Sequence, residues 1–167
     1  AASDKAQSLR VLLVGSAQQY GHVAEDDQPI SEDRPLKPLT PYAVSKTSQE
    51  LLGQQYFLSE QLPVFYTRSF NHTGPQQADS YVCSSFARQV AEIELGLRKP
   101  VLRVGNLSAR RDFTDVRDIA RAYVAIVEQG RPGRAYNVCR GEAVSIQTVL
   151  DRLIELGDVE LEVEVAS

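Results

Sequence analysis

The 167-residue chain is poor in the residues on which several kinds of protein depend. It contains no Trp, no Met, two His and two Cys. Cys83 and Cys139 are too few and too isolated for a disulfide framework or a zinc site, so we expect no metal and two small buried thiols. No stretch is long and apolar enough to span a bilayer, and no secretory signal is visible. We therefore expect no membrane partner and a cytoplasmic location.

The chain also lacks an excess of positive charge. Its formal net charge is −4, which argues against a general nucleic-acid binder. Hydrophobic residues make up 43% and charged residues 24%, which is typical of a globular fold. A length of 167 residues suits one domain with a sizeable core, and we find no internal repeats.

Apolar runs alternate with amphipathic stretches along the chain. This alternation predicts an α/β fold with a largely parallel sheet. Residues 21–39, rich in acids and Pro, predict a long loop, and we expect residues 71–79 to be a loop as well. The predicted strands are 9–14, 63–70, 101–104, 135–138 and 161–165, and the predicted helices are 41–60, 80–97, 116–129 and 145–156.

Two features of the predicted helices can be checked directly. Ser80 and Ser145 are expected to cap the second and fourth helices, because a hydroxyl there accepts a backbone hydrogen bond. The helix over 41–60 is expected to pack through an apolar stripe, which consists of Leu51, Leu52, Tyr56 and Phe57.

The most informative stretch opens the helix over 41–60. Thr40 can cap it and Pro41 suits its first turn. Tyr42 and Lys46 lie four residues apart, so both project from one face. A cationic Lys beside a phenol favours the phenolate, so Tyr42 can pass protons near neutral pH. Ser16, at the end of the first strand, can supply a second hydroxyl to the same carbonyl oxygen.

An exposed Tyr and Lys on an ordinary amphipathic helix would show the same spacing, so the motif alone is weak. Its context strengthens it. A strand that ends in Ser16 precedes the motif, and a strand that ends in Asn71-His72-Thr73-Gly74-Pro75 follows it. We therefore interpret the stretch as functional.

These motifs resemble the extended short-chain dehydrogenase/reductases that act on nucleotide sugars. The resemblance rests on Gly15-Ser16 with Tyr20-Gly21, on Tyr42-x-x-x-Lys46, and on the blocks 68–75 and 111–118. It covers the chain from about Arg10 to the end and is strongest with the GDP-4-keto-6-deoxy-mannose reductase branch, a sister of GDP-mannose 4,6-dehydratase. It implies a partial Rossmann-like, doubly wound parallel sheet from about 9–74 and 111–140. A small discontinuous substrate lobe would come from about 75–110 and 141–167.

The resemblance also implies catalytic roles. Tyr42 would protonate the C4 keto oxygen of the sugar, Ser16 would hydrogen-bond that oxygen, and Lys46 would hold the nicotinamide ribose, which makes Tyr42 and Lys46 the cofactor contacts. The dehydratase branch carries a Glu at the position of Gln18, and a neutral amide cannot act as a base. Gln18 therefore favours a reductase or an epimerase over a dehydratase, unless it is simply a loop side chain.

Four further residues are implied in substrate binding. Asn71 matches the family Asn that binds the sugar or its phosphates, and Arg111 matches the Arg that meets the pyrophosphate. Arg88 is a weaker candidate for the same group, and Asn106 lies where the GDP branch positions the guanine. A single Arg can equally be a solvated charge, and we favour that interpretation for Arg117.

One motif of the family is missing. Its members begin with a strand and a Gly-rich turn that cradles the cofactor pyrophosphate at a helix amino end. The chain contains neither G-x-G-x-x-G nor G-x-x-G-x-x-G. We therefore expect a truncated domain that does not bind NAD(P), the family's cofactor, by itself.

Two hypotheses of function follow. In the first, the chain is an NAD(P)-dependent reductase of a GDP-linked 4-keto sugar, completed by a separate chain that supplies the missing half. In the second, it is a catalytically silent remnant that acts as a nucleotide-sugar-binding or oligomerising module. A dehydratase or an epimerase is a further alternative. Because the helix that carries Tyr42 pairs across a dimer axis in the family, we also expect a homo-oligomer.

Overall fold

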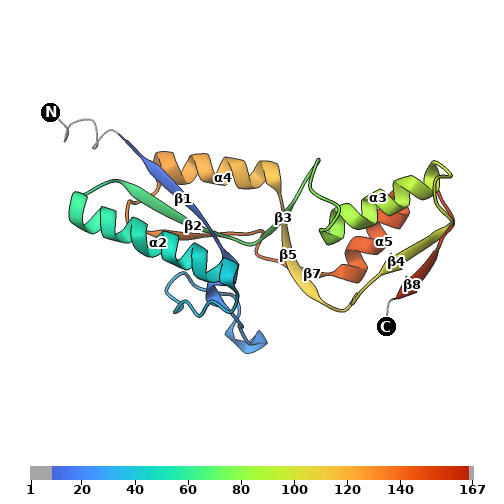
Figure 1. The fold of residues 1–167 in the computed structure, drawn as a ribbon, viewed down its shortest axis with the longest axis horizontal. Helices are drawn as coiled ribbons and strands as arrows, with labels where there is room; N and C mark the ends of the chain where they lie inside the picture. Colours follow the sequence, from blue (N-terminus) through green and yellow to red (C-terminus); the bar gives the residue numbers. More distant parts are fainter. Residues whose placement is uncertain (1–8, 166–167) are drawn as a thin grey trace.

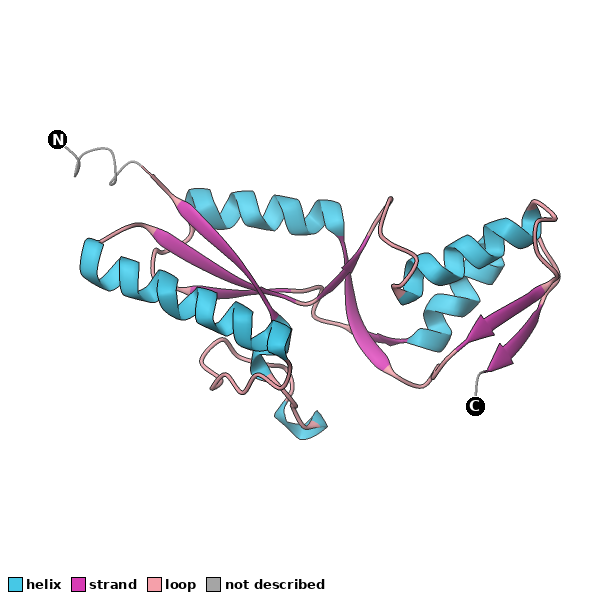
Figure 2. Ribbon diagram, viewed as in Figure 1, coloured by secondary structure: helices cyan, strands magenta, loops and turns pink. Residues whose placement is uncertain are grey.

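The computed structural model describes residues 9–165. Figure 1 shows an elongated molecule, and Figure 2 shows its helices and strands. The helices are α2 (Pro41–Glu60), α3 (Val82–Glu94), α4 (Val116–Gln129) and α5 (Ile146–Leu156), with 3-10 turns η1 (Ala17–Tyr20) and η2 (Glu25–Asp27). The strands are β1 (Val11–Ser16), β2 (Val64–Ser69), β3 (Asn71–Thr73), β4 (Val101–Val104), β5 (Arg110–Asp115), β6 (Ala135–Val138), β7 (Ala143–Ser145) and β8 (Glu162–Val165).

The first sheet has the parallel order β1-β2-β6, with β2 in the centre. Helices α2 and α4 lie on its opposite faces (Figure 1). All six residues of β2 are buried, because both of its faces are covered. Tyr66 and Arg68 of β2 point toward α2, whereas Ser69 bonds the hydroxyl of Tyr123 on α4 at 2.7 Å. The carboxyl end of β1 lies beside the amino end of α2.

The remaining strands form two smaller sheets, β3-β5-β7 and β4-β8. All their pairs are parallel except β5 with β7, which is antiparallel. Helices α3 and α5 pack together against β4. The core of this part of the molecule consists of Phe86, Val90, Leu102, Val104, Ile146 and Leu150. The predicted α/β class is therefore confirmed, with its strands divided among three sheets.

Helix α2 begins as its sequence predicts. The Thr40 hydroxyl accepts a hydrogen bond from the amide of Ala43, and Pro41 occupies the first turn. The apolar stripe was predicted wrongly, because Leu51 and Leu52 are exposed on this helix. α2 instead faces the sheet through Ala43, Glu50 and Gly53. A side chain at Gly53 would meet Tyr66 and other sheet residues, so glycine permits a close approach.

Four other predictions of local structure need correction. Helix α3 begins at Val82 rather than after Ser80, and its N-cap residue, Tyr81, makes no side-chain capping bond. The first strand runs two residues later than predicted, from Val11 to Ser16. Residues 71–79 are not all loop, because Asn71–Thr73 pairs with β5. Strands β5 and β7 were missed altogether, because β5 is mostly polar, β7 is only three residues long, and their pairing is what orders them.

The structure also shows where the two cysteines lie, and whether its described residues could hold a metal ion or cross a membrane. Cys139 is exposed and Cys83 is half-buried, so neither is the buried thiol that we expected. Burial raises the pKa of the Cys83 thiol all the same. Over residues 9–165, no group of His, Cys, Asp and Glu could hold a metal ion. None of the helices there has the length and apolar character needed to cross a membrane.

Candidate active site

The carboxyl end of β1 turns sharply into η1 at Ser16. The Ser16 hydroxyl accepts a hydrogen bond from the amide of Gln18 at 3.3 Å, and the Ser16 amide donates to Oε1 of Gln19 at 2.8 Å. A side chain at Gly15 would collide with Gln19 and with the carbonyl of Thr67. The backbone of Gly15 and Ser16 therefore lies directly against the Gln19 amide.

Tyr42 and Lys46 stand over this turn, on the first two turns of α2. Lys46 Nζ donates to the carbonyl of Val14 at 2.9 Å, which ties it to the end of β1. It also lies 5.9 Å from the ring centroid of Tyr42. Tyr42 is 51% exposed, and within residues 9–165 its hydroxyl has no hydrogen-bond partner. The fold thus places the hydroxyls of Ser16 and Tyr42 at the same end of the sheet, with the ammonium beside them.

A buried ion pair that the sequence did not predict lies beneath these residues. The carboxylate of Glu50, one turn after Lys46, accepts hydrogen bonds from Arg68, from Nη2 at 2.6 Å and from Nε at 3.1 Å. Both side chains are almost fully buried. Burial by itself lowers the pKa of Arg68, but its hydrogen bonds to Glu50 and Tyr20 outweigh that effect and raise it. The available signal was a single charge within the otherwise uncharged strand 64–69, which requires a partner if it is buried.

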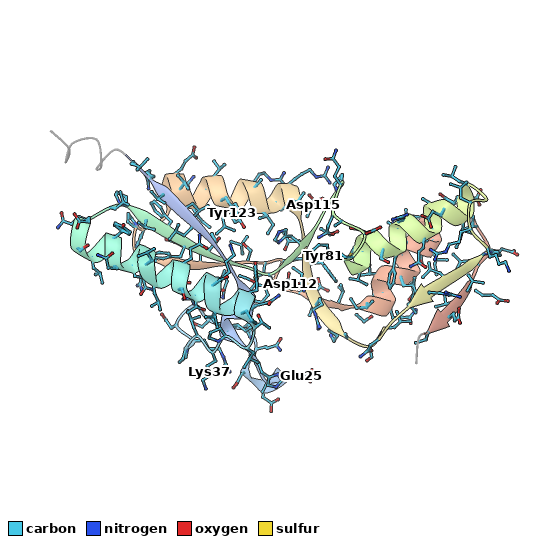
Figure 3. The ribbon with its side chains drawn as sticks, in the orientation of Figure 1. Glu25, Lys37, Tyr81, Asp112, Asp115 and Tyr123 are labelled. Atoms are coloured by element: carbon cyan, nitrogen blue, oxygen red, sulfur yellow. The ribbon has the colours of Figure 1, made fainter. Side chains whose placement is uncertain are left out.

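The network extends to the long loop over 21–39. Arg68 Nη1 donates to the hydroxyl of Tyr20 at 3.0 Å and to the carbonyl of Glu32 at 2.8 Å. Tyr20 in turn donates to Asn137 of β6 at 2.7 Å, and burial raises the Tyr20 pKa. Figure 3 shows the loop, marked by Glu25 and Lys37, beneath the amino end of α2.

The pairing of β3 with β5 brings two of the predicted substrate residues near each other. Asn71 is in register with Phe113, and Arg111 lies two residues earlier in β5. Alternate residues of a strand share a face, so Arg111 and Phe113 project to the same side. Asn71 and Arg111 therefore belong to adjacent strands within about 7 Å along the strand direction.

Arg111 differs from the other Arg candidates in its charge partners. Its Nη1 donates to the carbonyl of Arg110 at 2.7 Å, and no carboxylate within residues 9–165 pairs with it. Arg88 is held by two carboxylates, those of Asp79 and Glu92. Arg117 is paired with Asp115 and is exposed. Of these cations, Arg111 has the most freedom to receive an anion.

The two remaining candidates for substrate binding are Asn106 and Gln18. Asn106 uses its Oδ1 locally, where it accepts from the amide of Ser108 at 2.9 Å and from its hydroxyl at 2.8 Å. Its side-chain NH₂ is therefore the group left for a ligand. Gln18 is exposed at the start of η1, next to Ser16.

Two of the hollows in the described structure are lined by none of the predicted site residues. One, of about 560 Å³, lies between α3, β5 and α5 and is lined by Cys83, Phe113 and Leu153 among others. The other, of about 740 Å³, runs beside β6 and is lined in part by Arg68 and Arg134. Ser16, Tyr42 and Lys46 line neither of these hollows, and the Tyr42 side chain is half-exposed at the surface.

An α/β sheet with a Ser at a strand end and a Tyr-x-x-x-Lys helix above it defines a class of oxidoreductases. Comparison with known proteins identifies the family within this class. A family model described as GDP-mannose 4,6 dehydratase matches residues 1–166. The chain therefore belongs to this family of nucleotide-sugar dehydratases, epimerases and reductases.

Individual relatives agree with this assignment. The chain is 41% identical to the GDP-6-deoxy-D-mannose reductase of Pseudomonas aeruginosa over 91% of its own length and 50% of that protein. It is 28% identical to human dTDP-D-glucose 4,6-dehydratase, over 93% of the chain and 42% of that enzyme. The chain thus spans about half the length of these curated relatives.

Solved structures give the same result. The structure of RMD from Pseudomonas aeruginosa complexed with NADPH superposes with a TM-score of 0.90 at 41% identity, over 92% of this chain and 52% of that one. A dTDP-glucose 4,6-dehydratase from Bacillus anthracis in complex with NAD gives a TM-score of 0.80 at 26% identity, over 94% and 49%. The structural neighbours confirm the Rossmann-like fold, and several of them bind NAD or NADPH.

Proposed function

We propose that the chain is the substrate-binding and proton-transfer half of an NAD(P)-dependent reductase that acts on the C4 keto group of a GDP-linked 4-keto-6-deoxy sugar. The observation that carries this proposal is the Tyr42 hydroxyl, which has no hydrogen-bond partner among the residues that the structure describes and lies with Lys46 and Ser16 at one end of the sheet. The likeness to a reductase of a GDP-linked sugar supports the choice of substrate.

Tyr42 and Ser16 would act on the same carbonyl oxygen. The Ser16 hydroxyl accepts from Gln18, which leaves its own proton free to donate to that oxygen. Tyr42 then transfers a proton to the oxygen as negative charge develops on it. General acid catalysis of this kind contributes about 10²–10⁴-fold in rate.

Lys46 fits the nicotinamide end of the cofactor. An ammonium has three N–H donors, and Lys46 gives one to Val14 and a longer one, of 3.4 Å, to Gln49. A donor therefore remains for a ribose hydroxyl, beside the phenol of Tyr42. When bound, the reduced cofactor supplies the hydride. This chain has no Gly-rich turn to fit the cofactor pyrophosphate, so we expect it to need a second chain or segment for that part.

Gln18 distinguishes reduction from dehydration. Dehydration requires a base that removes a carbon-bound proton, and the amide of Gln18 cannot accept one. Gln18 is exposed beside Ser16, where it can hydrogen-bond the sugar. A reductase is therefore favoured over the dehydratase activity that gives the family its name.

The nucleotide would occupy the substrate lobe of about 75–110 and 141–167, together with the adjoining strands. Arg111 is the proposed phosphate contact because it has no carboxylate partner in the described structure. Asn71, on the adjacent strand, would bind the sugar or its phosphates, and the Asn106 amide would meet the guanine. Arg88 is a weaker candidate, since two carboxylates already neutralise it.

An NMR titration of the purified chain with GDP-mannose tests this proposal. We expect shifts at Asn71 and Arg111, and Arg111→Ala should weaken binding by roughly 10- to 150-fold, the equivalent of about 1.5–3 kcal/mol for a charge-assisted hydrogen bond. Arg117→Ala is the matched control and should change little. Equal losses in both variants would indicate nonspecific charge attraction, and no shifts near either residue would contradict the proposed site.

A homo-oligomer remains part of the proposal. Leu51, Leu52 and Tyr56 form an exposed apolar face on α2, which a second copy of the chain can cover. Sedimentation at micromolar concentration should detect a dimer or a larger species. A strict monomer would remove this part and leave the substrate site untouched.

A further inference from the structure

Glu50 continues the line of catalytic residues along α2 into the protein interior. It lies one turn after Lys46 and two turns after Tyr42, so the three side chains share one face of the helix. Tyr42 is open to solvent, whereas Glu50 is only 3% exposed. A buried carboxylate destabilises the folded state unless charged and hydrogen-bonding groups surround it. The partners of Glu50 therefore indicate its structural role.

One of those partners is the side-chain amide of Gln19, whose nitrogen and oxygen each make a hydrogen bond. Its Nε2 donates to Oε2 of Glu50 at 2.8 Å, and its Oε1 accepts from the backbone amide of Ser16 at 2.8 Å. Gln19 has no exposed surface. A carboxylate accepts hydrogen bonds and does not donate them, so the NH₂ end of the amide must face Glu50. The oxygen end is thereby directed at Ser16.

We propose that Glu50 is a positioning residue that, through Gln19, holds the Ser16 turn in register with Tyr42 and Lys46. The inference rests on the proposed function only in taking Ser16 and Tyr42 as the proton-transfer pair. Gln19 packs tightly against Gly15, where a side chain would collide with its Oε1, so the turn cannot shift toward the amide without a clash.

Arg68 makes the arrangement rigid. It forks onto Glu50 with two hydrogen bonds, which fixes the plane of the carboxylate. Its Nη1 also donates to the Tyr20 hydroxyl and to the carbonyl of Glu32, in the loop over 21–39. The buried pair of Glu50 and Arg68 therefore holds the helix, the serine turn and this loop together, and the loss of the Glu50 charge should loosen both the turn and the loop.

Amide hydrogen exchange of the ligand-free chain, read by ¹⁵N NMR, tests the proposal directly. The Ser16 amide should be strongly protected in the wild type, although β1 is an edge strand. Gln19→Met keeps the size of the side chain and removes both hydrogen bonds, so Ser16 protection should fall by roughly tenfold, as expected for about one hydrogen bond. Gln55→Ala, an exposed glutamine of α2, is the control and should leave Ser16 protection unchanged.

Gln19→Glu supplies a readout that loss of packing cannot imitate. The Glu50 carboxylate raises the pKa of the introduced carboxyl, which is protonated at low pH and can then donate to Glu50 while accepting from Ser16. At higher pH the two carboxylates repel and the Ser16 contact is lost. Between about pH 5 and about pH 8, Ser16 protection in this variant should therefore fall, after correction for intrinsic exchange, while the wild type stays constant.

Two results would overturn the proposal. One is an unprotected Ser16 amide in the wild type, which requires no variant to fold. The other is a Ser16 amide whose protection in Gln19→Glu matches the wild type at every pH. No nucleotide sugar is present, so a failure of substrate binding leaves this test intact, and a failure here leaves the binding titration intact.

Discussion

Replacing Glu50 by Gln should destabilise the protein far more than the same change at the surface. The substitution keeps the size of the side chain and removes its charge. Arg68, which is almost as buried as Glu50, then loses its counter-ion. The new NH₂ group also faces donors, because Glu50 accepts hydrogen bonds from Arg68 and from Gln19.

The size of the effect follows from this burial. Removal of one partner of a buried ion pair costs about 3–5 kcal/mol, because an uncompensated charge remains in the interior. For a protein of this length, each kcal/mol lowers Tm by about 2–4 °C, so the expected decrease is about 6–20 °C. That is a large part of a typical stability of about 5–15 kcal/mol.

Urea denaturation followed by circular dichroism measures the loss. Glu155→Gln is the matched control, because Glu155 pairs with Arg152 by a similar contact but is 63% exposed, and it should cost less than about 1 kcal/mol. If both variants lose the same small amount, the Glu50–Arg68 pair is not buried and desolvated as described, and the positioning role of Glu50 falls with it.

Two further predictions follow from other buried groups. Burial, and then the charge of Glu50, raise the pKa of Tyr66 to about 12 from 10.0, so the stability that Tyr66 contributes is fully present below pH 10 and is lost as the pH rises through about 12. Urea titrations across this range should show that the free energy of unfolding falls less at alkaline pH in Tyr66→Phe than in the wild type. Some decrease should remain in the variant, because burial also raises the Tyr20 pKa. An identical decrease in both proteins would contradict the assignment. Gly15→Ala should cost about 1–3 kcal/mol, because its methyl group would collide with Gln19 and with the Thr67 carbonyl, and a thermal melt with unchanged Tm would show that the turn has room.

Much of the fold could be predicted because local chemistry determines it. Thr40 and Pro41 mark the start of α2, and Ser145 caps α5 by accepting from the amide of Thr148. Local sequence also accounts for the inward face of α3, since Phe86, Val90 and Ile93 recur at helical spacing and all are buried. In each case a short stretch of sequence is sufficient.

The features that were predicted wrongly depend on contacts between segments that are distant in the sequence. Strands β5 and β7 exist because they pair with each other and, through β5, with β3, and no local pattern reports such pairing. The exposed face of α2 looked like a core stripe because Leu51 and Leu52 are apolar, while the helix in fact approaches the sheet through Gly53.

The candidate site divides in the same way. The spacing of Tyr42 and Lys46 is local and could be recognised in the sequence. The contact of Lys46 with β1, and the ion pair between Glu50 and Arg68, join segments that are far apart in the chain. Arg88 was a candidate by residue type alone, and only the structure shows that two carboxylates hold it.

The central claim is that this chain carries the nucleotide-sugar side of a reductase site and little of the cofactor side. Calorimetric titration of the purified chain with GDP-mannose, and separately with NADPH, tests it most directly. We expect measurable binding of GDP-mannose at one site per chain and negligible binding of NADPH. Tight binding of NADPH, with a Kd in the low micromolar range, and no heat from GDP-mannose would contradict it.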